Sequence, residues 1–360
     1  MTTTENDGRL RIMILFGGRS DEHDVSILSA TNVFAALDQT KYEAIPVYVT
    51  REGAWKLSTY AEGSLSLSAD GPTILPVPGG KGDIVCQSAD DHTTVFPPVD
   101  AIFPVLHGQW GEDGSVQGLA AVARIPLVGC GILGSANALD KVIAKRLLDA
   151  AGLPTAKSAT LKPEDPVSFT QLAKELGVPF FLKPATQGSS VGVGKVSTDD
   201  DYRAVLARGF ELDRKVIAEE YIDAREIECA VLENPDGTLF ISTLGEIVTA
   251  DSHAFYTYDA KYVDADGAQL VIPADIPAET AQLMRSLASD AFQAVGCDGM
   301  ARVDFFLKAD GNVIVNELNT IPGFTDISMY SKVMAKSGVS YSKLIERLID
   351  HGLSRFEKDD

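Results

Sequence analysis

In the N-terminal third of the chain, short apolar runs alternate with stretches that have the periodicity of amphipathic helices. The runs predicted to be strands cover residues 10–16, 44–49 and 100–105. The first run ends at Gly17-Gly18, and a helix with a capping serine or aspartate is predicted to begin near residues 20–24. This alternation predicts a parallel α/β sheet, which binds ligands at the carboxyl ends of its strands. The Gly-, Pro- and Ser-rich stretch 61–83 is predicted to be a loop or hairpin.

The pattern changes after residue 134. Ser135 is predicted to cap an apolar-periodic helix over 136–150, which Gly152 and Pro154 end. Short strands are predicted next near residues 159, 180–183, 193–196 and 216–221, and a helix near 200–208. Two strands, a helix and a hairpin then follow at 227–233, 239–247, 278–295 and 300–318. We therefore predict an N-terminal α/β domain and two α+β units, with bounds 1–134, 135–222 and 223–360.

The charge of the chain limits its partners. Its 51 acidic and 31 basic residues give a formal net charge of −20, which argues against nucleic acid or an anionic membrane as the main partner. A phosphate ligand would therefore need a local cluster of positive charge. The four cysteines are far apart and form no C-x-x-C pair, so neither a zinc knuckle nor a disulfide framework is predicted. A polar N-terminus without an apolar span of membrane length predicts a soluble, cytoplasmic protein.

A glycine-rich stretch, KPATQGSSVGVGK at residues 183–195, has the composition of a phosphate-binding loop. The P-loop pattern G-x-x-x-x-G-K-[ST] requires a glycine where Ser189 stands and a hydroxyl residue where Val196 stands. The dinucleotide pattern G-x-G-x-x-G requires its third glycine where Ser197 stands. The stretch therefore fits neither pattern, and taken alone it could equally be a flexible surface loop.

The stretch 300–318 predicts a β-hairpin around the turn sequence Ala-Asp-Gly-Asn. If Asp310-Gly311 is the centre of the turn, the residues that face each other across the strands are Asp304 with Glu317 and Arg302 with Asn319. Cross-strand partners share a face of the sheet, so all four polar side chains are predicted to project on the same side. A bulge in either strand would change this register.

The polar face of the predicted hairpin suggests a metal site. Two carboxylates about 5 Å apart at their Cβ atoms repel each other unless a cation lies between them. Asp304, Glu317 and Asn319 supply the oxygen ligands that Mg²⁺ takes together with waters and nucleotide phosphates. Arg302 on the same face could hold an anion. From the residues alone, a solvated sheet face of mixed charge is the alternative.

Five further stretches complete a recognisable set: GGRSDEHDVS, HGQWGEDGSVQG, LDKVIAK, KPATQGSSVGVGKV and NELNTIPGFTDIS, at residues 17–26, 107–118, 139–145, 183–196 and 316–328. With the hairpin, they closely resemble the D-alanine–D-alanine ligase family of the ATP-grasp superfamily, in the expected order and over nearly the whole chain. The resemblance implies a three-domain ATP-grasp architecture whose N-terminal domain contains a parallel sheet. It also implies ATP-dependent ligation of two D-alanine molecules through a D-alanyl phosphate, for peptidoglycan precursors, by a cytoplasmic homodimer whose partners are small molecules.

The resemblance further implies which residues bind ATP and metal. Lys141 and Lys183 contact the phosphates, and Glu219 and Glu226 contact the adenine amino group and the ribose hydroxyls. The backbone of Glu220 and Tyr221 contacts adenine, and Ser189 and Ser190 belong to a glycine-rich flap over the nucleotide. In this reading the stretch 188–192 folds over the triphosphate. The residues implied to hold two Mg²⁺ ions, with Mn²⁺ as a possible substitute, are Asp304, Glu317 and Asn319.

For the amino-acid substrates, the resemblance implies that Glu22 faces the ammonium group of the first D-alanine. His107 lies near the carboxylate of the same substrate, where we expect it to orient the substrate rather than transfer a proton. Arg302 and the backbone N–H of Gly323 stabilise the tetrahedral oxyanion. Ser328 binds the carboxylate of the second substrate. The sequence does not identify the base that deprotonates the second amine.

The aromatic stretch 254–262 resembles the mobile lid of the family, which excludes water from the acyl phosphate. Within it, Lys261 assists Ser328, and Tyr262 hydrogen-bonds Ser189, which is itself linked to Glu22. Because related D-lactate ligases change this tyrosine or the lid, Tyr262 favours an amine as second nucleophile. The alternatives are a D-alanine–D-lactate or D-alanine–D-serine ligase, and a nucleotide-binding sensor without catalysis. A dinucleotide oxidoreductase is a further alternative, but this chain lacks the remaining glycines of the dinucleotide-binding pattern.

Overall fold

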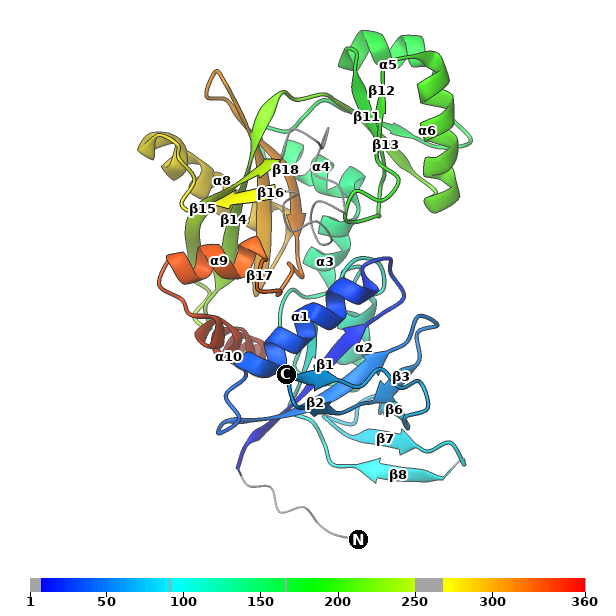
Figure 1. Cartoon of the computed structure of the whole chain (residues 1–360), viewed down its shortest axis with the longest axis vertical. Helices are drawn as coiled ribbons and strands as arrows, with labels where there is room; N and C mark the ends of the chain where they lie inside the picture. Colours follow the sequence, from blue (N-terminus) through cyan, green and yellow to red (C-terminus); the bar gives the residue numbers. More distant parts are fainter. Residues whose placement is uncertain (1–7, 91, 166, 250–267, 360) are drawn as a thin grey trace.

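The computed structural model describes residues 8–90, 92–165, 167–249 and 268–359. Three sheets with flanking helices make up the described part of the chain, and a two-stranded ribbon, β4 (Tyr60–Ala61) with β5 (Ser64–Leu65), accompanies the first of them. Figure 1 shows the N-terminal sheet at the bottom and the other two sheets side by side above it. The predicted combination of α/β and α+β parts is confirmed. The domain boundaries themselves remain predictions.

The N-terminal sheet has seven strands in the order β8-β7-β6-β3-β2-β1-β9. Their bounds are β1 Leu10–Gly17, β2 Tyr42–Val49, β3 Trp55–Leu57, β6 Thr73–Pro76, β7 Ile84–Gln87, β8 Thr93–Phe96 and β9 Ala101–Pro104. The predicted parallel arrangement holds for β2, β1 and β9. Strands β3, β6, β7 and β8 extend the sheet in antiparallel fashion and were not predicted individually.

Strand β1 is apolar along its length because both faces of the sheet are covered. Ile12 and Ile14 share a core with residues of α1 (His23–Ala36), whereas Met13 and Leu15 share a core with residues of α2 (Ser115–Ala123). A strand buried on both faces shows a continuous apolar run rather than alternation. This central position fixes the carboxyl end of β1 and the start of α1.

Two predicted helix caps are wrong. The cap of α1 is Glu22, not a serine or aspartate, and its side chain caps no backbone N–H. Ser135 is buried within α3 (Ile132–Leu139), where its hydroxyl donates to the carbonyl of Cys130. The predicted helix breaks at Asp140, whose extended backbone starts α4 (Lys141–Ala150) and whose side chain accepts two backbone N–H groups. Aspartate in an extended conformation is a strong N-cap, so it ends one helix and begins the next.

The central sheet is antiparallel, with the order β10-β13-β11-β12. Its strands and helices are β10 Ser158–Leu161, β11 Phe180–Pro184, β12 Gly194–Val196, β13 Val216–Glu220, α5 Phe169–Leu176 and α6 Asp199–Leu212. Both helices pack on this sheet around Phe180 and Leu172. Helix α5 was not predicted. The flap of residues 185–193 joins β11 to β12 at the open edge of the sheet.

The third sheet is also antiparallel, with the order β16-β15-β14-β17-β18. Its bounds are β14 Ala224–Glu233, β15 Leu239–Thr249, β16 Ala268–Val271, β17 Met300–Lys308 and β18 Val313–Asn319. Helix α8 (Ala278–Val295) shares a core with Ile227 and Val303, and α9 (Met329–Lys336) shares another with Ala230 and Leu232. The two helices therefore cover opposite faces of β14.

The hairpin of β17 and β18 pairs Asp304 with Glu317 and Arg302 with Asn319, as predicted. The predicted turn is nevertheless wrong, because Lys308 bonds the carbonyl of Asn312 around a three-residue turn with Gly311 at positive φ. The register then shifts by one residue between Asp304 and Phe305. This bulge at Asn316 offsets the change in the turn, so the polar pairs meet as expected.

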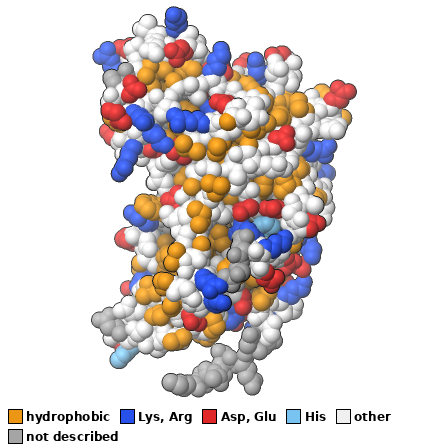
Figure 2. Space-filling model, turned by 180° about the vertical axis from the view of Figure 1, so that it is seen from behind, with side chains coloured by type: hydrophobic (Ala, Val, Ile, Leu, Met, Phe, Trp, Pro, Cys, Tyr) orange, Lys and Arg blue, Asp and Glu red, His pale blue; other side chains and the backbone are white. Residues whose placement is uncertain are grey.

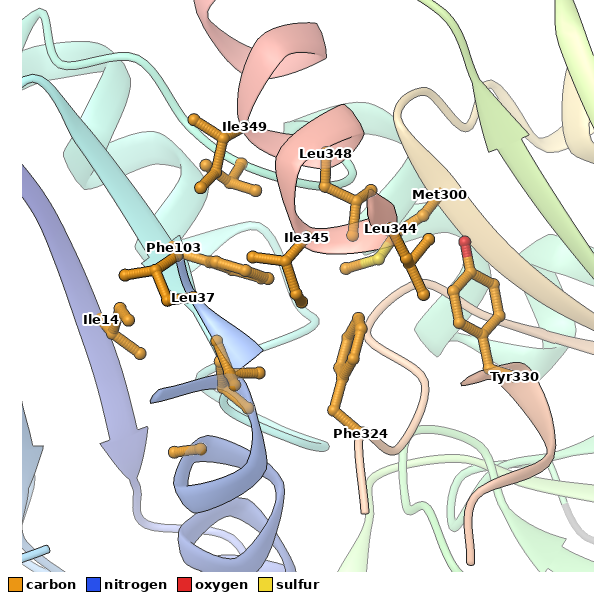
Figure 3. Close-up of a cluster of buried hydrophobic side chains, with 14 of the residues drawn as sticks. Ile14, Leu37, Phe103, Met300, Phe324, Tyr330, Leu344, Ile345, Leu348 and Ile349 are labelled. Atoms are coloured by element: carbon orange, nitrogen blue, oxygen red, sulfur yellow. The ribbon is translucent and has the colours of Figure 1, made fainter. Parts of the chain in front are cut away.

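The C-terminal helix α10 (Tyr341–Asp359) follows the third sheet in the chain but lies against the first. Figure 3 shows Ile345 of α10 beside Phe103 of β9, with Met300 of β17 and Phe324 close by. One apolar cluster therefore joins the N-terminal sheet, α10 and the third sheet. It sets the distance between the carboxyl end of β1 and the loop that follows β18.

The face of the molecule in Figure 2 carries charges of both signs. On the face in Figure 2, basic and acidic side chains are interspersed among apolar patches, despite the net charge of −20. Among the described residues, no helix is both long and apolar enough to cross a membrane.

Candidate active site

A cavity of about 300 Å³ lies where segments of the three sheets meet. It is large enough for a small-molecule ligand. Its walls come from the start of α1, the loop after β9, helix α4, strands β11 and β13, and the β17–β18 hairpin. The predicted site residues that line it are Glu22, His107, Lys141, Lys183, Ser189, Ser190, Glu219, Glu220, Tyr221, Glu226, Arg302, Asp304, Glu317, Asn319 and Gly323.

Three other predicted site residues do not line this cavity or cannot be placed. Ser328 lies just behind the wall, where its hydroxyl accepts the N–H of Thr325 and where a Cβ added to Gly323 would come within 2.7 Å of it. Lys261 and Tyr262, with the rest of the predicted lid at 254–262, lie outside the described residues. Their roles remain predictions.

A buried ion cluster forms one end of the cavity. The Glu219 carboxylate, at the end of β13, contacts Lys145 Nζ at 2.8 Å and Lys183 Nζ at 2.5 Å. Burial alone would raise the pKa of Glu219, but the two lysines outweigh it and lower the pKa to about 2. The pKa of Lys183 is in turn raised, because Glu219 and more distant carboxylates outweigh the effect of its burial. The carboxylate is thus an acceptor at neutral pH.

Lys141 connects the flap with the polar hairpin. Its ammonium donates to the carbonyl of Gln187 at 2.6 Å and lies 4.0 Å from the Glu317 carboxylate. Its backbone N–H donates to the carbonyl of Ala185. Since Lys141 is the first residue of α4, the break at Asp140 is what directs this cation toward the flap.

On the hairpin, Arg302 and Asp304 form a bidentate pair, with both N–O distances at 2.7 Å. Asn319 donates to the same carboxylate at 2.9 Å, and Glu228 of β14 approaches Arg302 at 3.0 Å. Such a fork is rigid and oriented. The arrangement holds one guanidinium on the cavity wall beside the predicted metal ligands.

The hairpin residues fit a hard cation by their chemistry. Asp304 and Glu317 are direct cross-strand partners, both line the cavity, and with Asn319 they offer only oxygen ligands. In this arrangement Arg302 pairs with Asp304, and Lys141 lies near Glu317. No group of three or more His, Cys, Asp or Glu residues is arranged as a metal site in the described part of the chain.

The buried Glu22 carboxylate also lines the cavity. The Ser189 hydroxyl donates to it, which links the flap to the start of α1. A Cβ at Gly188 would lie 2.6 Å from Glu22 Oε2, and one at Gly108 would lie 2.9 Å from the same atom. A side chain at either position would therefore displace the Glu22 carboxylate from where it lies. Ser189 and Ser190 both have positive φ, a conformation that costs energy for residues with a side chain.

A hydrogen-bond network joins the loop after β9 to the loop after β18. His107 Nδ1 is 2.9 Å from the carbonyl of Ile321, and its Nε2 is 3.0 Å from the hydroxyl of Ser29. Because a carbonyl can only accept, Nδ1 carries the proton. Burial, with help from Arg302, lowers the pKa of His107 despite Glu22 and the carbonyl. The ring is therefore neutral, and its Nε2 accepts from Ser29.

Glu112 completes this network from a buried position. Its carboxyl oxygens accept the N–H of Gly108 at 2.9 Å and of Ile321 at 2.5 Å. Burial, reinforced by the charge of Glu22, raises the pKa of Glu112 to about 8, although the two N–H donors oppose the shift. Ile321 is thus bound through both its N–H and its carbonyl.

Sequence reasoning missed three polar residues of the site: Glu112, Lys145 and Glu228. The first two lie inside stretches that carried the resemblance, and Lys145 stands four residues after Lys141, the spacing that places two side chains on one helical face. That spacing was a usable signal. Glu228 had only strand alternation to mark it, because its partner Arg302 lies on another strand.

Comparison with known proteins identifies the relatives of the chain. Two protein-family models match: the D-ala D-ala ligase N-terminus over residues 11–130 and the D-ala D-ala ligase C-terminus over residues 147–350. A D-alanine–D-alanine ligase A from Brucella suis is 58% identical over 97% of this chain and 99% of its own length. A ligase A from Salmonella typhimurium is 45% identical over 96% of both chains.

Solved structures agree with the sequence comparisons. The D-alanine-D-alanine ligase from Coxiella burnetii has a TM-score of 0.84 at 32% identity, and the similarity covers 98% of this chain and 96% of that one. VanG, a D-Ala:D-Ser ligase from Enterococcus faecalis, has a TM-score of 0.83 at 33% identity over 96% and 99% of the two chains. The predicted ATP-grasp architecture is confirmed, and the chain belongs to the D-alanine–D-alanine ligase family.

Proposed function

We propose that the protein joins two D-alanine molecules to D-alanyl-D-alanine at the expense of ATP, through a D-alanyl phosphate. The observation that carries the proposal is one cavity that brings together three cations, Lys141, Lys183 and Arg302, with the enclosed carboxylate of Glu22. The cations suit a triphosphate and a developing oxyanion, whereas the carboxylate suits an ammonium group. A phosphoryl transfer needs charge neutralisation and positioning rather than a covalent step on the protein.

In this proposal the nucleotide occupies the end of the cavity formed by β11, β13 and α4. Lys141 and Lys183 neutralise the phosphates, Glu219 accepts from the adenine amino group, and Glu226 binds the ribose hydroxyls. The backbone of Glu220 and Tyr221 contacts the base. Asp304, Glu317 and Asn319 would hold two Mg²⁺ ions, or Mn²⁺, and a metal there supplies neutralisation of charge on the transferred phosphoryl group.

The first D-alanine is proposed to bind at the opposite end. Glu22, held by Ser189, pairs with its ammonium group. His107 orients the carboxylate side of the substrate, and the engagement of both ring nitrogens supports this role over proton transfer. The carboxylate oxygen of this first D-alanine attacks the γ-phosphorus of ATP, ADP leaves, and the acyl phosphate forms.

The second D-alanine then attacks the acyl carbon through its amine. Arg302 and the N–H of Gly323 stabilise the tetrahedral oxyanion, which collapses with loss of phosphate. Ser328 and Lys261 are proposed to bind the second carboxylate, and Tyr262 to complete the link through Ser189 to Glu22. Ser328 Oγ lies just behind the wall, where a Cβ added to Gly323 would come within 2.7 Å of it, and this supports placing the second carboxylate near Gly323.

The second substrate is the open point within the family. The sequence relatives named above are D-alanine–D-alanine ligases, but one structural relative is a D-Ala:D-Ser ligase. Release of ADP and phosphate should be measured with D-Ala, L-Ala, D-Ser and D-lactate, each alone and in competition with D-Ala. We expect the dipeptide of D-alanine as main product at neutral pH. Predominant ester or D-Ala-D-Ser would overturn the assignment.

Further properties are proposed from the family and from the charge and composition of the chain. We propose a homodimer in the cytoplasm, without nucleic-acid or membrane partners. Light scattering of the purified protein tests the oligomeric state, and a monomer at micromolar concentration would contradict it.

A further inference from the structure

The cluster around Glu219 contains two lysines with different surroundings. Lys145 projects from the middle of α4, and its ammonium also donates to the carbonyl of Ala156 at 3.1 Å. Its side chain is 7% exposed, against 17% for Lys183, which lines the cavity. Lys145 does not line the cavity, and Lys183 is therefore the lysine that a ligand there can reach.

A single carboxylate with two ammonium partners needs an explanation, because each ion loses hydration when it is buried. If ATP draws Lys183 to its phosphates, Glu219 loses one of its two partners. A buried carboxylate left without any cation is strongly unfavourable. With Lys145 in place, Glu219 stays paired whether or not Lys183 remains.

The carboxylate also keeps room for the base. Each ionised carboxylate has about four acceptor sites, and one contact with each lysine uses two of them. Glu219 can therefore accept from an amino group while Lys145 holds it in position.

We propose that Lys145 is the permanent counter-ion of Glu219, a positioning residue that frees Lys183 to bind the triphosphate. The inference rests on the proposed function, because it assigns the phosphates to Lys183 and the base to Glu219. Its consequence is that removing Lys145 weakens ATP binding although Lys145 touches no nucleotide. Glu219 would then have Lys183 as its remaining partner and would hold it away from the phosphates.

The test is calorimetric titration of ATP into the full-length protein without D-alanine, together with the KM values for ATP and D-alanine. We expect Lys145→Met to weaken ATP binding at least tenfold and to change the KM for D-alanine less than threefold. Arg146→Met is the matched control, because Arg146 is the next residue of α4 and is exposed. It should bind ATP within twofold of the wild type.

A double variant separates the counter-ion role from simple packing. In the Glu219→Gln background the carboxylate in direct contact with Lys183 is gone, so adding Lys145→Met should cost less than threefold in ATP affinity. Should Lys145→Met alone fail to fold, the double variant is expected to fold and to bind ATP like Glu219→Gln. The inference would be overturned if the losses of ATP affinity in the two single variants multiplied in the double variant, or if the double variant did not fold. Normal ATP binding by Lys145→Met would overturn it as well. Absence of D-alanine-dependent ADP release by the wild type would instead overturn the proposed function.

Discussion

His107 Nδ1 donates to the carbonyl oxygen of Ile321 at 2.9 Å, and these two residues belong to loops 214 positions apart in the chain. The N–H of Ile321 is bound as well, by the Glu112 carboxyl of the His107 loop. Two residues later comes Gly323, whose N–H is the proposed oxyanion donor. The loop that carries His107 and Glu112 therefore fixes the position of the loop that carries Gly323, relative to the proposed site of the first substrate.

Glu112→Gln should lower kcat at least tenfold. It should change the KM for ATP less than threefold. Both carboxyl oxygens can accept a hydrogen bond even when Glu112 is protonated, whereas an amide nitrogen cannot, so one buried backbone N–H loses its partner, at a cost of about 1–3 kcal/mol. Steady-state kinetics and the melting temperature, which should fall by a few degrees, check this. Glu164→Gln is the exposed control. A Glu112→Gln enzyme with wild-type kcat would show that the two loops need no such connection.

Glu317→Ala should reduce turnover at least a hundredfold and leave the melting temperature almost unchanged, because Glu317 is a proposed metal ligand at a partly exposed position. Asp304→Ala should reduce turnover equally but also lower the melting temperature, since the bidentate partner of Arg302 is lost. ADP release measured beside thermal unfolding distinguishes the two effects. Removal of divalent metal should abolish wild-type turnover, and Mn²⁺ should restore it. Near-normal turnover of Glu317→Ala would refute the metal assignment.

The hairpin shows what sequence can and cannot give. Alternation and a turn signal placed Asp304 opposite Glu317, yet the turn has three residues and a bulge at Asn316 offsets the difference. The correct pairing therefore came from two compensating errors. Local sequence does not encode a bulge, because the extra residue is accommodated by packing against the neighbouring strand.

The other differences between prediction and structure have separate origins. The helix break at Asp140 could have been predicted, since an aspartate between two apolar-periodic segments is a capping signal. The antiparallel strands β3, β6, β7 and β8 are short, and their pairing depends on the edge of a sheet that is already formed. Glu228 could not be predicted as a partner of Arg302, because that contact exists only once β14 and β17 pair.

The ion cluster predicts a specific pH dependence of stability. The pKa of Glu219 is about 2 in the folded protein, below the ordinary value of 4.5. The unfolded chain therefore binds the proton first, so this stabilisation is present above pH 4.5 and is lost as the pH falls toward 2. By pH 3.5 the loss should be on the order of 1 kcal/mol. Denaturant unfolding of the wild type and Glu219→Gln should show this difference in slope, and parallel curves would contradict it.

Ser189→Ala should raise the KM for the first D-alanine about tenfold while ATP binding without D-alanine stays within threefold. The Ser189 hydroxyl donates to Glu22, and its loss removes a charge-assisted hydrogen bond, which is worth about 1.5–3 kcal/mol when buried. The backbone at Ser189 has positive φ, so alanine keeps the strain and changes only the hydroxyl. Ser189→Gly would alter the flap backbone, whereas Ser190→Ala is the neighbouring control for loss of a hydroxyl. If the two alanine variants raise this KM equally, the Ser189–Glu22 contact does not position the substrate.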